Sequence, residues 1–255
     1  MSRSFGRTVP LSLARRFIGD LMHVAASVPS VPMQRRMHLA PLVAARSALR
    51  QRIGWCALFT KAFAMVAARR PELRRAYMNF PRPRLFEHAD NFAAIAVERE
   101  YDGDKSAFFA HIRAPERWEL SALEARLRFF KEAELSRVRS FRRALRYSGW
   151  PLVCRRLMWW YGLNVSGRAR AKYLGSFGVS STAGEGASQL SLWTPLTTSL
   201  FYSPFSADGS IDVRLVFDHR VFDGCVAARA LAEVEKTLLG EILTEVNHLC
   251  RANAA

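Results

Sequence analysis

Apolar residues recur at helical spacing through most of residues 13–70. The first such stretch ends at Val28-Pro29, and an extended piece that contains Pro32 follows over residues 31–39. Pro41 then opens a second helix, which Gly54 closes. Residues 55–70 are apolar nearly all round, which predicts a deeply buried third helix. The inward positions of the first two helices are Leu13, Phe17, Ile18, Leu21, Val24 and Ala25, followed by Leu42, Ala45, Leu49 and Ile53.

The middle of the chain changes from a strand pattern to a basic helical one. Residues 92–97 form a short, almost wholly apolar run that predicts a buried strand. Residues 121–146 have a helical and strongly basic pattern, which Gly149-Trp150-Pro151 breaks. A second segment rich in aromatic and basic residues covers residues 152–161.

The last third of the chain predicts strands and one closing helix. Residues 177–181 and 197–202 have strand composition, and apolar and polar positions alternate over residues 211–218, which predicts a half-buried strand. Asp208-Gly209 supplies the turn before that strand, and a helix follows Gly224. Strands mixed with segregated helices predict an α+β layered fold, and we expect one domain over residues 1–255.

The chain carries a net charge of +16, from 38 basic and 22 acidic residues, which favours polyanions, anionic membranes or acidic carrier proteins as partners. The four cysteines form no Cys-x-x-Cys pair, so we expect no metal site. The N-terminus lacks the apolar core of a signal peptide, and no run of about 18 apolar residues occurs. These features predict a cytoplasmic protein, with a peripheral position at the inner membrane face as the alternative.

His219 is the candidate catalytic residue because of its neighbours. It follows the alternating strand directly, and a strand end is where a rigid element presents a side chain to a cavity. Asp223 and Gly224 come four and five positions later, and Gly224 allows a close backbone approach or a positive φ. Two acids and an arginine flank the imidazole, which is enough charge to fix the local geometry by ion pairing.

The run Phe-Asp-His-Arg-Val-Phe-Asp-Gly over residues 217–224 resembles the signature of the catalytic domain of dihydrolipoamide acyltransferases, which shares its fold with chloramphenicol acetyltransferase. Residues 59–63 (Phe-Thr-Lys-Ala-Phe) and 70–73 (Arg-Pro-Glu-Leu) resemble the family's buried helix and the turn after it. Residues 91–97 and 175–181 resemble two of its strands, and roughly three quarters of the chain is covered. The signature residues that match are Asp218, His219, Arg220, Asp223 and Gly224.

The resemblance implies that His219 is a general base, which takes a proton from a thiol, hydroxyl or amine as that group attacks an acyl thioester. Ser180 aligns with the hydroxyl that hydrogen-bonds the oxyanion, with Ser181 as the alternative if the register is shifted by one. Asp223 completes the catalytic set by ordering the loop, without a direct proton-transfer role. The other residues of the motif support this set: Asp218, Arg220 and Gly224.

The resemblance also implies a homotrimer, because one copy of this fold holds half of each site and the histidine works opposite a neighbour's serine strand. No lipoyl domain or Ala/Pro-rich linker is visible, so we expect coenzyme A or a phosphopantetheine thioester on an acyl carrier protein as the co-substrate, and no tightly bound cofactor. The sequence therefore predicts a stand-alone acyltransferase. The alternatives are a non-catalytic trimeric scaffold with the same fold and an acyltransferase that modifies lipids at a membrane surface.

The basic segment over residues 126–172 departs most from the family pattern. This segment contains thirteen basic residues and two acidic ones, and aromatic residues are interleaved, among them Phe129, Phe130, Trp150, Trp159, Trp160 and Tyr161. This composition suits membrane headgroups, an acidic carrier protein or the phosphates of coenzyme A, whereas no nucleic-acid-binding module is apparent. The residues expected to bind substrate or partner are Arg142, Arg143, Arg155 and Arg156.

Overall fold

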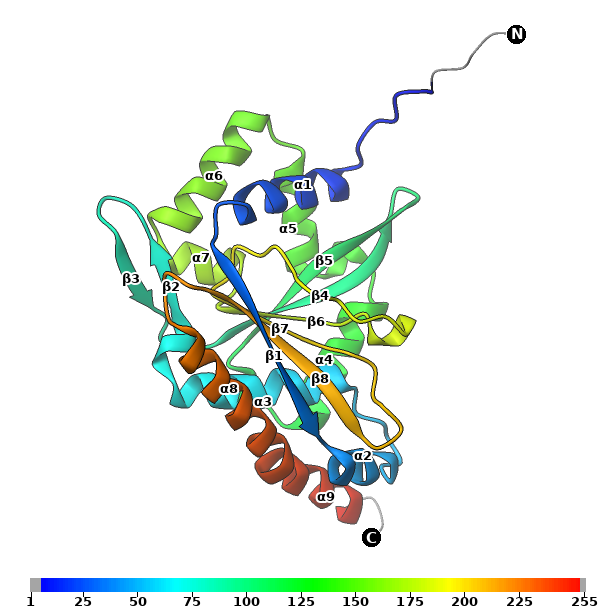
Figure 1. The fold of residues 1–255 in the computed structure, drawn as a ribbon. Coiled ribbons are helices and arrows are strands. Elements are labelled where there is room, and N and C mark those ends of the chain that lie inside the picture. Colours follow the sequence, from blue (N-terminus) through cyan, green and yellow to red (C-terminus); the bar gives the residue numbers. More distant parts are fainter. Residues whose placement is uncertain (1–5, 253–255) are drawn as a thin grey trace.

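The computed structural model describes residues 6–252, and within them six strands form one mixed sheet in the order β1-β8-β7-β6-β4-β5 (Figure 1). The short β6 runs parallel to both of its neighbours, β4 and β7, whereas the other pairs are antiparallel. The predicted α+β class is therefore confirmed. The strands are β1 (Ser30–His38), β4 (Phe92–Tyr101), β5 (Asp104–Arg113), β6 (Phe177–Ser180), β7 (Thr198–Tyr202) and β8 (Ser210–Asp218).

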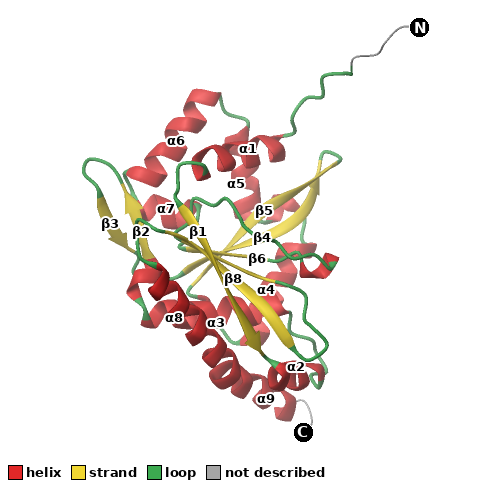
Figure 2. Cartoon of the chain, in the orientation of Figure 1, coloured by secondary structure: helices red, strands yellow, loops and turns green. Residues whose placement is uncertain are grey.

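Helices pack on both sides of the sheet (Figure 2). The predicted buried helix is α3 (Trp55–Arg69), which packs on the main core together with α8 (Gly224–Thr237). A second, smaller core forms against β4 and involves α1 (Leu13–Ala25), α6 (Leu152–Asn164) and the segment after α7 (Gly167–Tyr173). The remaining elements are α2 (Ala40–Ser47), α4 (Leu120–Glu132), α5 (Arg139–Ser148), α9 (Leu243–Ala252) and the hairpin of β2 (Arg75–Met78) and β3 (Arg84–Glu87). No helix in this described range is long and apolar enough to cross a membrane.

Two predicted helices are shorter than expected. The helix that Pro41 opens ends at Ser47 rather than at Gly54, and the Arg46 side chain holds the following loop by donating to the Ile53 carbonyl at 2.6 Å. The basic stretch 121–146 is two helices, because α4 ends at Glu132 and α5 begins at Arg139. Arg99 donates to the carbonyls of Phe130 and Ala133 at the end of α4, which satisfies acceptors that a continuous helix would use.

The apolar run at 92–97 is only the first part of β4. The strand continues to Tyr101, turns at Asp102-Gly103 and returns as β5, which the sequence analysis did not predict. Asp102 and Gly103 have φ values of 54° and 72°, the conformation that an Asp-Gly hairpin turn requires. This dipeptide was therefore the signal in the sequence that could have revealed β5.

The strand that precedes His219 is more deeply buried than its alternating pattern suggests. β8 lies between β1 and β7, and eight of its nine residues are buried. Val216 and Asp218 have no exposed surface, although both occupy positions that the alternation assigned to solvent. The prediction of a half-buried strand was wrong because neighbouring segments cover the second face as well. A buried strand gives His219 a rigid support.

Candidate active site

His219 stands at the end of β8 with its side chain half exposed. Its backbone N–H donates to the Pro29 carbonyl at 3.2 Å, which ties the end of β8 to the start of β1. Its Nδ1 lies 3.4 Å from Oδ1 of Asp223, and the two side chains are 51% and 83% exposed. This contact is a loose ion-pair distance rather than a tight hydrogen bond. Because Asp223 faces Nδ1, the nitrogen left to accept a proton from a substrate is Nε2.

An ion pair between a buried carboxylate and an arginine that is 31% exposed holds the loop that carries His219. Asp218 has no exposed surface, and Arg220 binds it through two bonds, Nε to Oδ1 at 2.9 Å and Nη2 to Oδ2 at 2.7 Å. The Arg220 backbone N–H donates to the same carboxylate at 3.0 Å. The guanidinium also lies over the Tyr77 ring, 4.4 Å from its centroid. The turn is thereby fixed on both sides of the imidazole.

Arg170 is a buried cation near this ion pair, although its place in the basic segment predicts only a basic surface. It is 3% exposed and donates to the backbone carbonyls of Tyr77 at 3.0 Å and Pro195 at 2.7 Å. Burial lowers its pKa to about 10, and the charge of Asp218 opposes that shift. Since α7 lies within an arginine-rich stretch, no local signal distinguishes Arg170 from its exposed neighbours.

Gly224 begins α8, for which Asp223 is the N-terminal flanking residue. The expected positive φ is absent, because the left-handed glycines of the described range lie elsewhere. A Cβ at this position would meet the terminal methyl of Met33 at 3.2 Å, which is the far end of a flexible side chain. Gly224 therefore contributes a moderately close approach and no unusual backbone conformation.

Ser180 ends β6 and lines a cavity of about 450 Å³. Two aromatic pairs with α3 hold the strands around it, with Phe63 4.9 Å from Phe177 and Phe59 stacked at 4.5 Å on Tyr202. Cys56 lines the same cavity, and burial raises the pKa of its thiol to about 11, so this thiol is protonated at neutral pH.

Ser181 lines the same cavity, but its hydroxyl is engaged in the protein. Its Oγ donates to the Tyr202 carbonyl at 3.1 Å and accepts from the Ala183 N–H at 3.1 Å. Those two bonds fix the turn that follows β6. Ser180 is therefore the hydroxyl of the pair that is better placed to bind a substrate.

Ser180 and His219 lie far apart along the sheet. Ser180 pairs with Phe201, which in turn pairs with Arg214 of β8, and His219 comes five residues after Arg214. Five residues of strand span about 17 Å, and the two intervening strand spacings add about 10 Å sideways. The structure does not bring the two side chains together within one chain.

The four arginines predicted to bind a partner fall into two groups. Arg142 and Arg143 meet on one wall of a basic cavity of about 360 Å³, described below. Arg155 is placed differently, because its guanidinium pairs at 2.8 Å with Asp20, which is buried. Arg156 lies half buried on α6, outside the lining of that cavity. The structure thus assembles two of the four.

No protein-family model matches the chain, and no curated protein matches its sequence. Solved structures do match. A probable dihydrolipoamide acetyltransferase from Listeria monocytogenes 4b F2365 superposes with a TM-score of 0.66 at 18% identity, covering 92% of this chain and 94% of that one. The dihydrolipoamide acetyltransferase of Azotobacter vinelandii gives a TM-score of 0.65 at 19% identity, with 92% of each chain covered.

A truncated catalytic core of the 2-oxoacid dehydrogenase multienzyme complex from Thermoplasma acidophilum is similar to the same extent. Its TM-score is 0.65 at 15% identity, and the match covers 92% of this chain and 99% of that one. These likenesses confirm the predicted fold, which is that of dihydrolipoamide acyltransferase catalytic domains.

Proposed function

We propose that the protein is an acyltransferase that moves an acyl group from a thioester to a hydroxyl, amine or thiol acceptor. The observation that carries this proposal is the setting of His219. A buried strand and the ion pair of the buried Asp218 with Arg220 hold the residue, yet its imidazole is half exposed and has Asp223 beside Nδ1. A fixed, accessible imidazole with one nitrogen free is what general-base catalysis needs.

In the proposed reaction, Nε2 of His219 accepts the proton of the acceptor group as that group attacks the thioester carbonyl carbon. The carbonyl oxygen becomes an oxyanion, and the hydroxyl of Ser180 donates a hydrogen bond to it. When the tetrahedral intermediate collapses, the carbon–sulfur bond breaks and the leaving thiolate takes the proton from the imidazolium. No covalent acyl-enzyme forms. Asp223 supports the imidazolium through its charge and does not transfer a proton.

The Azotobacter vinelandii relative supports these assignments, because a serine, a histidine and an asparagine were studied in its catalytic mechanism. Its asparagine follows its histidine by four positions, the spacing that separates His219 from Asp223. The present chain has an aspartate rather than an asparagine at this position.

The distance between Ser180 and His219 supports an active site shared between two subunits. Because neither side chain is long enough to span this distance, we propose that a second copy brings its Ser180 to the His219 of the first. We propose a homotrimer with three such shared sites. With cyclic symmetry, every copy contributes His219 to one site and Ser180 to the next. A non-catalytic trimeric scaffold with the same fold is the alternative.

For the donor we propose coenzyme A or the phosphopantetheine arm of an acidic acyl carrier protein, as a co-substrate that is not tightly bound. The basic cavity at Arg142 and Arg143 supports this choice because arginine forks bind phosphate through paired hydrogen bonds. The acyl chain and the acceptor remain to be identified by mass spectrometry of products formed from a panel of donors.

The test is thiol release from a panel of acyl-coenzyme A and acyl-carrier-protein thioesters in the presence of cell extract. We expect His219→Ala to reduce release by at least a hundredfold. His248→Ala is the matched control, because this histidine is exposed on α9, and it should retain full activity. Equal activity of His219→Ala and the unmodified protein would refute the mechanism, and no turnover with any donor would favour the scaffold.

One observation favours action at a membrane surface as a second candidate function. The outer side of α6 exposes five large apolar side chains next to the basic cavity: Leu152, Val153, Leu157, Trp160 and Tyr161. Apolar and aromatic residues beside arginines suit an interface with anionic lipid. Sedimentation with anionic vesicles that weakens with salt supports this candidate, and no binding at low salt excludes it.

A further inference from the structure

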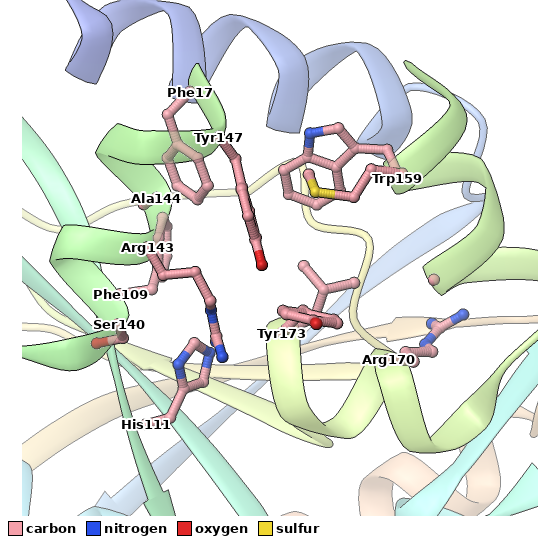
Figure 3. Close-up of a pocket in the computed structure, with 13 residues that line it drawn as sticks. Phe17, Phe109, His111, Ser140, Arg143, Ala144, Tyr147, Trp159, Arg170 and Tyr173 are labelled. Carbon is pink, nitrogen blue, oxygen red and sulfur yellow. The ribbon is translucent and has the colours of Figure 1, made fainter. Parts of the chain in front are cut away.

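A composite hollow lies beside the sheet, between β5 and the layer of α1, α5, α6 and α7 (Figure 3). It has two compartments, one of about 50 Å³ and one of about 200 Å³. Both are lined by the same five residues, so the compartments adjoin: Phe17, Phe109, His111, Tyr173 and Leu174. Neither compartment contains His219 or Ser180, which separates this hollow from the proposed active site.

The larger compartment is apolar. Its walls come from Ile18, Leu21 and Met22 of α1 and from Ala94 and Ala107 of the sheet. Trp193, which is 61% exposed, stands on its outer side. For comparison, an apolar cavity of roughly 150 Å³ is large enough to bind benzene and stays free of water. A compartment of this size and lining suits part of an alkyl chain.

The smaller compartment holds polar groups that the protein leaves available. Both ring nitrogens of His111 are buried, and neither makes a hydrogen bond of normal geometry among residues 6–252, although the Leu174 backbone lies close enough to favour the protonated ring weakly. Figure 3 shows His111 and Arg143 side by side, with the Tyr147 hydroxyl pointing into the same space. Burial, and secondarily the charge of Arg143, lowers the pKa of His111 to about 4, so the ring is neutral at pH 7. A buried polar group without a partner is costly, and a bound ligand can supply the partner.

A basic rim adjoins this compartment. The rim encloses about 360 Å³ and shares Arg143, Tyr147 and Tyr173 with the compartment below it. Arg143 is held in place, because it donates to the Lys172 carbonyl at 2.7 Å and lies over the Tyr173 ring at 4.5 Å. No acidic residue is among the rim residues, which are Arg139, Arg142, Arg143, Arg146, Tyr147, Lys172 and Tyr173.

The rim brings like charges close together, since Arg139, Arg142 and Arg146 are spaced at three and four residues along α5. Such pairs are mutually destabilising, and an anion bound between them relieves the repulsion. The rim is basic, the smaller compartment is polar and the larger compartment is apolar. A ligand that fits all three has an anionic group, a polar linkage and an alkyl chain.

We propose that this hollow binds an amphiphile with one alkyl chain and an anionic head group, either phosphate or carboxylate. The head group contacts Arg142, Arg143 and Arg146 at the rim. The linkage next to the head group hydrogen-bonds His111, and the alkyl chain fills the space between α1 and the sheet. The rim is the same basic cavity that the proposed function assigns to the phosphates of the acyl donor, whereas neither His219 nor Ser180 lines the hollow, so ligand binding is measured here independently of turnover.

Isothermal titration of the full chain with dodecyl phosphate, below its micelle concentration, tests the proposal. We expect one site per chain and an affinity at least tenfold tighter than for inorganic phosphate or for dodecanol. Inorganic phosphate lacks the alkyl chain, and dodecanol lacks the anionic head group. Binding of dodecyl phosphate no tighter than that of inorganic phosphate would overturn the proposal.

Two variants test the two parts of the hollow separately. Arg142→Gln combined with Arg146→Gln removes exposed rim charges and should weaken binding at least tenfold. The matched control is Arg128→Gln with Arg137→Gln, two exposed arginines outside the rim, which should bind as the unmodified protein does. Ala107→Phe places a ring in the apolar compartment and should weaken dodecyl phosphate binding tenfold without changing the weak binding of inorganic phosphate. Unchanged affinity in the rim variant, at an unchanged melting temperature, contradicts the assignment.

Two further ligands identify the source of the head group. Titration with dodecanoate in place of dodecyl phosphate distinguishes a carboxylate head group from a phosphate. The ligand that binds more tightly identifies the class of head group. Lysophosphatidate supplied in phosphatidylcholine vesicles distinguishes a membrane source. Its transfer into the soluble protein indicates a lipid ligand, whereas binding of dodecyl phosphate without transfer indicates a soluble alkyl phosphate.

Discussion

Mixing two inactive variants should restore activity if the active site is shared between subunits. His219→Ala removes the proposed base, and Ser180→Ala removes the proposed oxyanion donor. Loss of a single oxyanion donor typically costs a factor of about 10² to 10³ in rate. Each variant alone should therefore be nearly inactive, and the informative measurement is the activity of oligomers that contain both.

The expected recovery follows from the sheet register. Ser180 is level with Arg214 across β7, whereas His219 lies about 17 Å further along the sheet, so no chain can use its own pair. In an equal mixture, the chance that a given interface joins a wild-type His219 to a wild-type Ser180 is one half times one half. About a quarter of the sites in randomly assembled trimers should then be intact, and about one third in trimers that contain both variants, because each mixed trimer has one such interface among its three.

The assay is thiol release by oligomers obtained through co-expression of the two variants with different affinity tags, after tandem purification. Mixing the separately assembled oligomers without exchange is the control and should show no recovery. If co-assembled oligomers are as inactive as the separate variants, the site is not shared between subunits. Recovery well above about one third of the wild-type activity would also contradict independent sites of this kind.

Three further predictions concern stability. Asp218→Asn leaves a buried amide beside Arg220, whose side chain is 31% exposed, and should destabilise the fold by about 1–3 kcal/mol, measured by urea unfolding. Gly209→Ala should cost about 1–3 kcal/mol, because φ is +76° and the new Cβ would meet Ala40 at 2.8 Å. The pKa of His88 is lowered to about 4, chiefly by burial, so the unfolded chain binds its proton first. Stability should therefore fall by up to about 3 kcal/mol between pH 6.5 and 4, and His88→Phe should flatten that slope.

Similar substitutions at exposed positions serve as matched controls for these three predictions of stability. Asp102→Asn changes an exposed turn aspartate that an asparagine can replace at positive φ, and it should alter stability little. Gly19→Ala lies on the exposed side of α1 with open space around the new Cβ, and it should stabilise by about 0.5–1 kcal/mol. An Asp218→Asn variant as stable as Asp102→Asn would mean that the ion pair between Asp218 and Arg220 does not stabilise the fold. A Gly209→Ala variant as stable as Gly19→Ala would mean that the turn relaxes freely. A pH slope unchanged in His88→Phe would assign that slope to other groups.

The elements that the sequence predicted well are those with strong local signals. The apolar circumference of α3, the turn at Gly209 and the alternation before His219 each depend on residues close in sequence. The strand β5 was not predicted, because the apolar run at residues 92–97 is only the first part of its partner β4. The Asp102-Gly103 turn marked the hairpin between the two strands. The break between α4 and α5 depends on Arg99, more than thirty residues away, which no local pattern reveals.

The same division applies to the candidate site. The sequence by itself determined which residue types stand where: a histidine at a strand end, an aspartate four residues later and a serine at the end of another strand. Tertiary structure decided which of these can act together, because strand order and register set the distance between Ser180 and His219.

The arginines illustrate the physical reason most clearly. In sequence, Arg143, Arg155 and Arg170 are equivalent members of one basic stretch. Folding buries Arg170 beneath the His219 loop, pairs Arg155 with Asp20 and leaves Arg143 at the rim of a cavity. The charge of a side chain follows from its identity alone, whereas its role depends on burial and on partners that come from distant parts of the chain.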